Sequence, residues 1–286
     1  MPAHLLIQDG AAPYWWTSPD IWVVPGNDPN GAPGSPVAGH NAYVWARVAN
    51  TGNLAAKGAR VDFYWANPAA QVAVGVATPI GCAFVDLDPG QSQEVLCLVP
   101  WMPVIVNGGH ECVLAVAHAS VDANALPDPL PTGYVFDPPA HDQIAQLNLS
   151  VLTAARAMAP MALMVSAVGR RDKQALLRIH LGGELDQRTL ANLGLRGVKP
   201  VRTPAARAGL ALQAQCCAPD ADPGAQELKL HVARATSVPV FVTVQADAIE
   251  PGHYQLIHVI EEVDGRIVGG VSYVLANHTH QQEQSS

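Results

Sequence analysis

The chain has 286 residues, enough for two domains of ordinary size, and 49% of them are apolar, so a sizeable core is expected. Only 14% are charged, against about 25% in an average globular protein, and the 24 glycines and 24 prolines favour many short strands and turns. The largest basic cluster is Arg170-Arg171-Asp172-Lys173, which we interpret as a solvated turn, so we expect no nucleic-acid partner. No apolar run approaches the roughly 20 residues of a membrane helix, so no transmembrane segment is expected.

Charge and tryptophan are unevenly distributed along the chain. Residues 1–150 hold 3 basic and 12 acidic side chains, a net charge of −9, and residues 151–286 hold 13 basic and 12 acidic, a net of +1. All six tryptophans lie at or before Trp101. Two domains with different cores are the simplest explanation.

Residues 1–19 are predicted to form an N-terminal arm, whose aromatic segment Tyr14-Trp15-Trp16 has two interpretations. It packs on the first domain, or it forms an exposed interaction patch, because large exposed apolar patches mark sites of binding. We therefore take Tyr14, Trp15 and Trp16 as the candidate binding residues.

Residues 20–152 carry the pattern of a first antiparallel β-sandwich. The predicted strands cover 20–24, 41–50, 59–66, 72–76, 80–86, 93–100, 111–119 and 143–152. Alternation is clearest in 41–50, where Val44, Ala46 and Val48 share one face. About eight short strands in about 135 residues is the spacing of a sandwich.

Five cysteines without a CxxC pattern argue against a zinc site or a disulfide framework; they are Cys82, Cys97, Cys112, Cys216 and Cys217. If strands 80–86 and 93–100 form a hairpin centred on Pro89-Gly90, Cys82 and Cys97 lie directly opposite each other. Two interpretations stay open: a disulfide between Cys82 and Cys97, or two small buried apolar side chains.

Residues 153–160 resemble a linker, and 161–276 restart the strand pattern as a second sandwich, followed by a polar tail over 277–286. The predicted strands cover 162–168, 174–182, 209–216, 227–234, 239–246, 253–262 and 266–275, with a short helix within 184–195. Asp264-Gly265 is the composition of a two-residue type I′ hairpin loop. Gly269-Gly270 indicates a bulge or a close backbone approach.

Catalytic motifs are missing from the sequence: there is no Gly-x-Ser-x-Gly, no His-Glu-x-x-His and no phosphate-binding glycine loop. Loop oxygens at 27–31 and at Asp86 and Asp88 are too few for calcium, and turn roles explain them. His278 and His280 lie in the tail, a poor place for a rigid metal site. We expect no catalytic residue, metal or cofactor.

A series of short motifs in the first half occurs in the order found in one known family. They are Asp20-Ile21-Trp22-Val23, Val48-Ala49-Asn50-Thr51-Gly52, Val61-Asp62-Phe63-Tyr64-Trp65, Leu87-x-Pro89-Gly90-Gln91, Trp101-x-Pro103, and His110-Glu111-Cys112-Val113-Leu114 followed by Asp122. Over residues 14–152 the chain resembles the CARDB family, the cell-adhesion-related bacterial domain. The resemblance implies an immunoglobulin-like sandwich, an accessory or surface role, and no catalytic residues.

These observations predict an all-β chain of two tandem immunoglobulin-like antiparallel sandwiches that is not an enzyme. The first hypothesis is a structural protein that self-assembles into a homo-oligomer, fibre or surface layer, with a head-to-tail contact between unlike domains. The alternative is an adhesion module that recognises a glycan or protein through the aromatic arm and the loops. A third is an enzyme whose residues converge only in three dimensions. Residues 1–10 lack the features of a signal peptide, so we expect a cytoplasmic protein or export by a non-classical route, and the family resemblance favours the surface.

Overall fold

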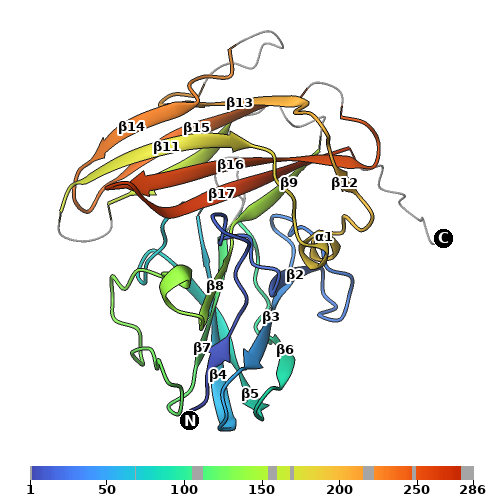
Figure 1. The fold of residues 1–286 in the computed structure, drawn as a ribbon, viewed down its shortest axis with the longest axis vertical. Coiled ribbons are helices and arrows are strands. Elements are labelled where there is room, and N and C mark those ends of the chain that lie inside the picture. Colours follow the sequence, from blue (N-terminus) through green and yellow to red (C-terminus); the bar gives the residue numbers. More distant parts are fainter. Residues whose placement is uncertain are drawn as a thin grey trace.

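The structure is a computed structural model that describes residues 2–67, 69–104, 112–153, 160–167, 171–214, 222–246 and 249–277. Nearly all of its regular structure is strand, which confirms the all-β prediction. Two pairs of packed sheets, here named the first and second sandwich, are arranged like the stem and bar of a T (Figure 1). Within the described residues no helix has the length and apolar character needed to cross a membrane.

The first sandwich contains the N-terminal strands. They are β1 (Leu5–Leu6), β2 (Ile21–Pro25), β3 (Ala42–Asn50), β4 (Ala56–Ala66), β5 (Thr78–Leu87), β6 (Ser92–Leu96), β7 (Cys112–His118) and β8 (Ile144–Leu147), with a 3-10 turn at Pro138–Ala140. In one sheet β3 pairs with β1, β2 and β6; the other has the order β5-β4-β7-β8, and all pairs are antiparallel.

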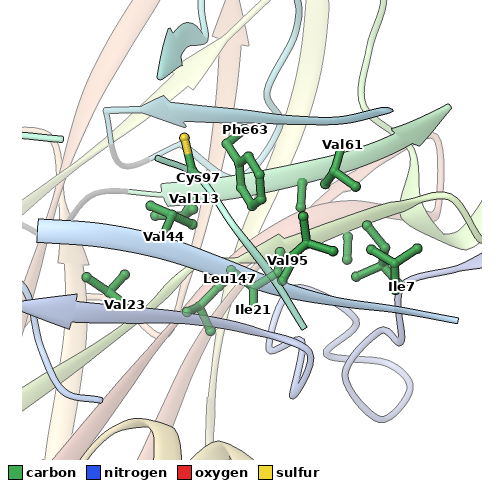
Figure 2. Packing of buried hydrophobic residues seen from close by; sticks show 14 of the residues in the cluster. Ile7, Ile21, Val23, Val44, Val61, Phe63, Val95, Cys97, Val113 and Leu147 are labelled. Carbon is green, nitrogen blue, oxygen red and sulfur yellow. The ribbon is translucent and has the colours of Figure 1, made fainter. Parts of the chain in front are cut away.

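Alternating side chains of these strands build the core of the first sandwich. Every second residue of β3 is buried, as predicted. Figure 2 shows Val44 on one sheet across from Phe63 and Val113 on the other. The opposite face of β7 is buried as well, because residues 126–136 cover it with Leu126 and Phe136. No strand forms at 72–76, where only isolated bridges occur.

The predicted hairpin of strands 80–86 and 93–100 is wrong. β5 pairs with β4 and β6 pairs with β3, so the chain crosses from one sheet to the other at Pro89-Gly90. The turn is attached to the end of β3, because the Asn50 backbone is hydrogen-bonded to Gly90 and Gln91 at 2.8 and 2.9 Å. Cys82 and Cys97 are therefore not paired across a ladder, and both are free thiols, the first exposed and the second buried.

The second sandwich contains the remaining elements. They are β9 (Leu149–Thr153), β10 (Met161–Ser166), β11 (Lys173–Leu181), α1 (Gln187–Asn192), β12 (Lys199–Pro200), β13 (Ala206–Ala211), β14 (Glu227–Val232), β15 (Ser237–Ala246), β16 (His253–Val263) and β17 (Arg266–Ala276). The large sheet has the order β14-β11-β16-β17-β9, with β12 added beside β16, and it packs on the sheet β10-β15-β13.

Two local predictions in this half are confirmed. Asp264 and Gly265 join β16 to β17 with φ angles of 51° and 73°, the positive values that a type I′ loop requires. The helix expected within 184–195 is α1, which begins after Asp186, whose carboxylate accepts a hydrogen bond from the Arg188 backbone N–H at 2.7 Å.

The boundary predicted at residue 152 is too late in the chain. β9 pairs in parallel with β17 and so belongs to the second sandwich. The change of sandwich occurs at Asn148, whose side-chain amide donates to the carbonyls of Ala69 and Gly270 at 2.9 and 2.7 Å. Of the predicted linker, residues 154–159 lie outside the described ranges, as does the tail from 278.

The two sandwiches share buried contacts. One hydrophobic cluster combines the core of the first sandwich with Leu185, Tyr254, Leu256 and Val274 of the second. An ion pair also lies at this boundary: Lys173 Nζ is 2.5 Å from Glu261 Oε1, and both side chains are buried. Lys173 is therefore not part of a solvated turn, and its ammonium also donates to Gln71 of the first sandwich at 3.1 Å.

Candidate functional site

The predicted binding residues lie at the junction of the two sandwiches. Trp16 is completely buried and Trp15 is 8% exposed, and both pack with Ile260 of β16. The interpretation as an exposed patch is therefore wrong for both tryptophans. The arm packs on both sandwiches: β1 pairs with β3 in the first, as predicted, whereas Trp15 and Trp16 pack against the second.

Glycines in β17 make room for this contact. A Cβ added at Gly270 would lie 2.2 Å from Trp16 Cζ2, and one added at Gly269 would lie 1.8 Å from the Ala70 carbonyl oxygen. The ladder also shifts register beside Gly269, between Glu261 and Glu262. The Gly269-Gly270 pair thus marks both a bulge and a close approach, the two features that its sequence indicated.

A chain of hydrogen bonds and ring contacts connects the arm to the large sheet. Trp16 Nε1 donates to Ser272 Oγ at 2.9 Å, and Ser272 Oγ is 2.7 Å from Nδ1 of His258. Tyr14 stacks on the His258 ring with centroids 3.6 Å apart, and its hydroxyl is hydrogen-bonded to His180. Sequence reasoning missed both histidines, which occur singly in their strands.

The protonation states follow from burial. Desolvation, assisted by nearby His180 and opposed by the Gly182 carbonyl, lowers the pKa of His258 to about 3, so its ring is neutral at pH 7. Ser272 accepts from Trp16 and can donate its own hydroxyl hydrogen to His258 Nδ1, the arrangement that leaves the ring proton on Nε2. Burial also raises the pKa of Tyr14.

This arrangement does not form a nucleophilic dyad that a substrate could reach. Ser272 is completely buried, and its oxygen contacts both Trp16 and His258. A serine nucleophile must reach a substrate and pass its proton to a base that is oriented by a third group. The Trp16–Ser272–His258 contacts instead hold the arm to β16 and β17.

Metal ligation finds no support in the described residues, where no three His, Cys, Asp or Glu side chains are grouped to hold an ion. The loop carboxylates considered from the sequence have structural partners. Asp28 accepts from the Asn30 backbone at 2.9 Å, Asp86 accepts from the Gly58 backbone at 2.7 Å, and Asp88 pairs with Lys57 at 2.9 Å. His278 and His280 lie outside the described residues.

An unpaired sheet edge is the main exposed apolar feature of the first sandwich. β5 is the terminal strand of its sheet, and Phe84 on it is 68% exposed. Residues 97–99 lie beside it, since a Cβ added at Gly81 would be 2.8 Å from Val99 Cγ2. Leu98 and Val99 are 75% and 46% exposed. We name Cys82, Phe84, Leu98 and Val99 the β5 surface.

Sequence reasoning missed the β5 surface because the predicted hairpin would have covered it. Pairing of residues 80–86 with 93–100 would have given hydrogen-bond partners to the backbone groups along the free edge of β5. With β6 paired to β3 instead, β5 has a ladder partner among the described residues only on its β4 side.

Comparison with known proteins shows no family. No family model and no curated protein matches the chain. A β-glucosidase from Kluyveromyces marxianus is 15% identical over 43% of this chain and 13% of its own, with a TM-score of 0.21. A red sea bream transglutaminase is 11% identical over 91% of this chain and 31% of its own, with a TM-score of 0.23. The calcium-binding domain CBD12 of CALX1.1 is 11% identical over 77% of this chain and 74% of its own, with a TM-score of 0.18. At these scores the likenesses carry no argument about function.

Proposed function

We propose that this chain is a non-enzymatic structural protein that assembles with copies of itself through the β5 surface. The observation that carries the proposal is β5 itself, a ten-residue edge strand with Phe84 68% exposed. Its residues 79–85 include no charged side chain. The CARDB-like motifs of residues 14–152 support the same class, because that family brings no catalytic residues.

Edge strands drive association because their outer N–H and C=O groups lack ladder partners. Native proteins usually block such edges with charges, prolines or short strands. On β5, Pro79 and Asp86 lie near the ends, and the centre is unprotected. Full burial of a phenylalanine side chain stabilises by about 1.5–3 kcal/mol, so covering the exposed part of Phe84 contributes about 1–2 kcal/mol.

The partner edge that we propose is β14 of the next copy. β14 is the terminal strand of the large sheet, and it lies at the opposite end of the molecule from β5 (Figure 1). It carries Lys229 and His231 on exposed positions, and residues 1–150 have a net charge of −9 against +1 for the rest. A contact between two different surfaces repeats from copy to copy, so it builds a filament rather than a closed dimer.

Light scattering after size exclusion, with negative-stain microscopy, tests the proposal. Wild-type protein is expected to grow in mass with concentration and to form rows of copies. Phe84→Lys and Leu98→Asp should weaken the contact by about 5- to 30-fold each, from the lost burial and an added charge. Val121→Lys, in the loop after β7, is the matched control and should assemble like wild type.

A monodisperse monomer at high concentration contradicts the proposal. A second result would contradict only the head-to-tail arrangement. In that case the protein forms a closed dimer that Phe84→Lys disrupts, while a charge change in β14 has no effect, so the contact involves β5 but not β14. Adhesion through the aromatic arm is not proposed, because Trp15 and Trp16 are buried.

A further inference from the structure

A cavity of about 260 Å³ lies at the junction, beside the Tyr14–His258 stack. Arm residues 8–19 form one wall, and residues 184–189 with Leu256 and His258 form the other. The cavity is separate from the β5 surface, so a ligand could bind there with or without self-assembly.

Three side chains that line the cavity have buried polar atoms without a hydrogen-bond partner. These atoms are Asp9 Oδ1, Thr189 Oγ1 and His258 Nε2. Thr189 is 2% exposed and His258 is 1% exposed. Buried polar groups in native proteins are nearly always satisfied, and one left unpaired is destabilising. Three such atoms around one cavity indicate a polar occupant.

The charged side chains around the cavity favour an occupant that carries a positive charge. Asp9, Glu184 and Asp186 line it, and its described lining includes no lysine or arginine. Burial first, and then Asp142 and Asp137, raise the pKa of Asp9 to about 8. A carboxyl in this setting is stabilised as an anion when a positive group arrives.

The hydrogen-bonding roles narrow the ligand further. Asp9 accepts when ionised, Thr189 can both donate and accept, and the Nε2–H of neutral His258 donates. The cavity therefore suits one cationic donor group and one oxygen that can accept. Leu185 and Leu256 add apolar wall for a short alkyl chain.

We propose that the cavity binds a small aliphatic amino alcohol, with its ammonium group at Asp9 and its hydroxyl group between Thr189 and His258. A bare divalent cation fits less well, because no three ligating side chains converge among the described residues. A neutral diol lacks the charge that the acidic lining selects.

Isothermal titration calorimetry of the full chain with 4-amino-1-butanol tests the proposal, with butylammonium, 1,4-butanediol and Ca²⁺ as comparison probes. The amino alcohol should bind with saturation at one site, and the other three more weakly. At pH 7 binding should release protons, seen as heats that differ between buffers, because Asp9 ionises beside the ammonium. The other titratable groups at the site are Tyr14, His180, Glu184, Asp186 and His258.

Asp9→Asn should weaken binding roughly 10- to 100-fold and remove the proton release. Thr189→Val provides a second variant: it should weaken binding while raising the Tm of the ligand-free protein, because an unpaired buried hydroxyl is removed. A merely structural role of Thr189 would not combine these two effects. Asp88→Asn, at an exposed ion pair outside the cavity lining, is the control and should change neither.

Two results would overturn the proposal. One is no saturable heat from the amino alcohol at millimolar concentration, which would mean that water alone fills the cavity. The other is 1,4-butanediol or Ca²⁺ binding as tightly as the amino alcohol, since recognition would then not involve an ammonium group.

Discussion

Replacing Gly269 with alanine tests how closely the two sandwiches approach each other. The new Cβ would lie 1.8 Å from the Ala70 carbonyl oxygen, and favourable contacts between heavy atoms need about 3.5 Å. The strand and the Ala70 backbone would have to separate by about 1.7 Å. Both are backbone, so no side-chain rotation relieves the clash. The movement also strains the hydrogen bonds from Asn148 to Ala69 and Gly270.

We expect Gly269→Ala to lower the free energy of unfolding by about 2–4 kcal/mol. Overpacking contributes about 1–3 kcal/mol and each weakened buried hydrogen bond about 1 kcal/mol, offset by about 0.4–1 kcal/mol from a less flexible unfolded chain. Urea unfolding followed by tryptophan fluorescence measures it, because Trp16 lies at this contact. Gly34→Ala is the control, since its nearest neighbour would be 3.8 Å away. A loss below about 0.5 kcal/mol for Gly269→Ala would refute the close approach.

Three further predictions concern the burial or exposure of single side chains. Lys173→Met should lower the free energy of unfolding by about 3–5 kcal/mol, because it leaves the Glu261 carboxylate buried without its partner. Adding Glu261→Gln should restore most of this loss, as measured by thermal unfolding. Burial raises the pKa of Asp9 in the folded protein from 3.8 to about 8. The folded state therefore holds this proton more tightly than the unfolded state, and the stability it contributes is lost as the pH rises between these values. The Tm of Asp9→Asn should accordingly fall less than the Tm of wild type between pH 5 and pH 9. Without reductant, iodoacetamide should label Cys82 in the native protein and Cys97 only after denaturation, and a pair that resists labelling in denaturant would restore the disulfide hypothesis.

The sequence predicted strands and loops well where their structure depends only on neighbouring residues in the chain. The alternation in 41–50 reports that one face of β3 is buried, and Asp264-Gly265 supplies the positive φ angles of its loop by composition. Strand partners were less predictable. The turn residues at Pro89-Gly90 suit a hairpin and a crossing, and the contacts made in the crossing, β6 with β3 and the turn with Asn50, involve residues distant in the sequence.

The candidate site illustrates the same limit for charged and polar groups. Lys173 lies in a run with two arginines, which is typical of a solvated turn, yet its ammonium contacts Glu261 of a distant strand and Gln71 of a distant loop. His258 gives no motif, because the groups that contact its ring, Ser272 and Tyr14, come from another strand and from the arm. The cavity beside it exists only after the two sandwiches are brought together.

The junction shows that two separate sequence signals belonged to one contact. The Trp15-Trp16 pair indicated a large apolar surface in need of cover, and Gly269-Gly270 indicated a backbone that something approaches closely. Each of these two signals is incomplete alone. A bulky ring can lie this close to a strand only where the strand residue lacks a Cβ, and a glycine pair within a strand is explained only when something approaches its backbone. Trp16 against Gly270 satisfies both, and the Trp16 N–H then reaches Ser272 on the same strand. Nothing local in either segment identifies the other as its partner, because the contact forms only when β17 and the arm meet in the folded chain.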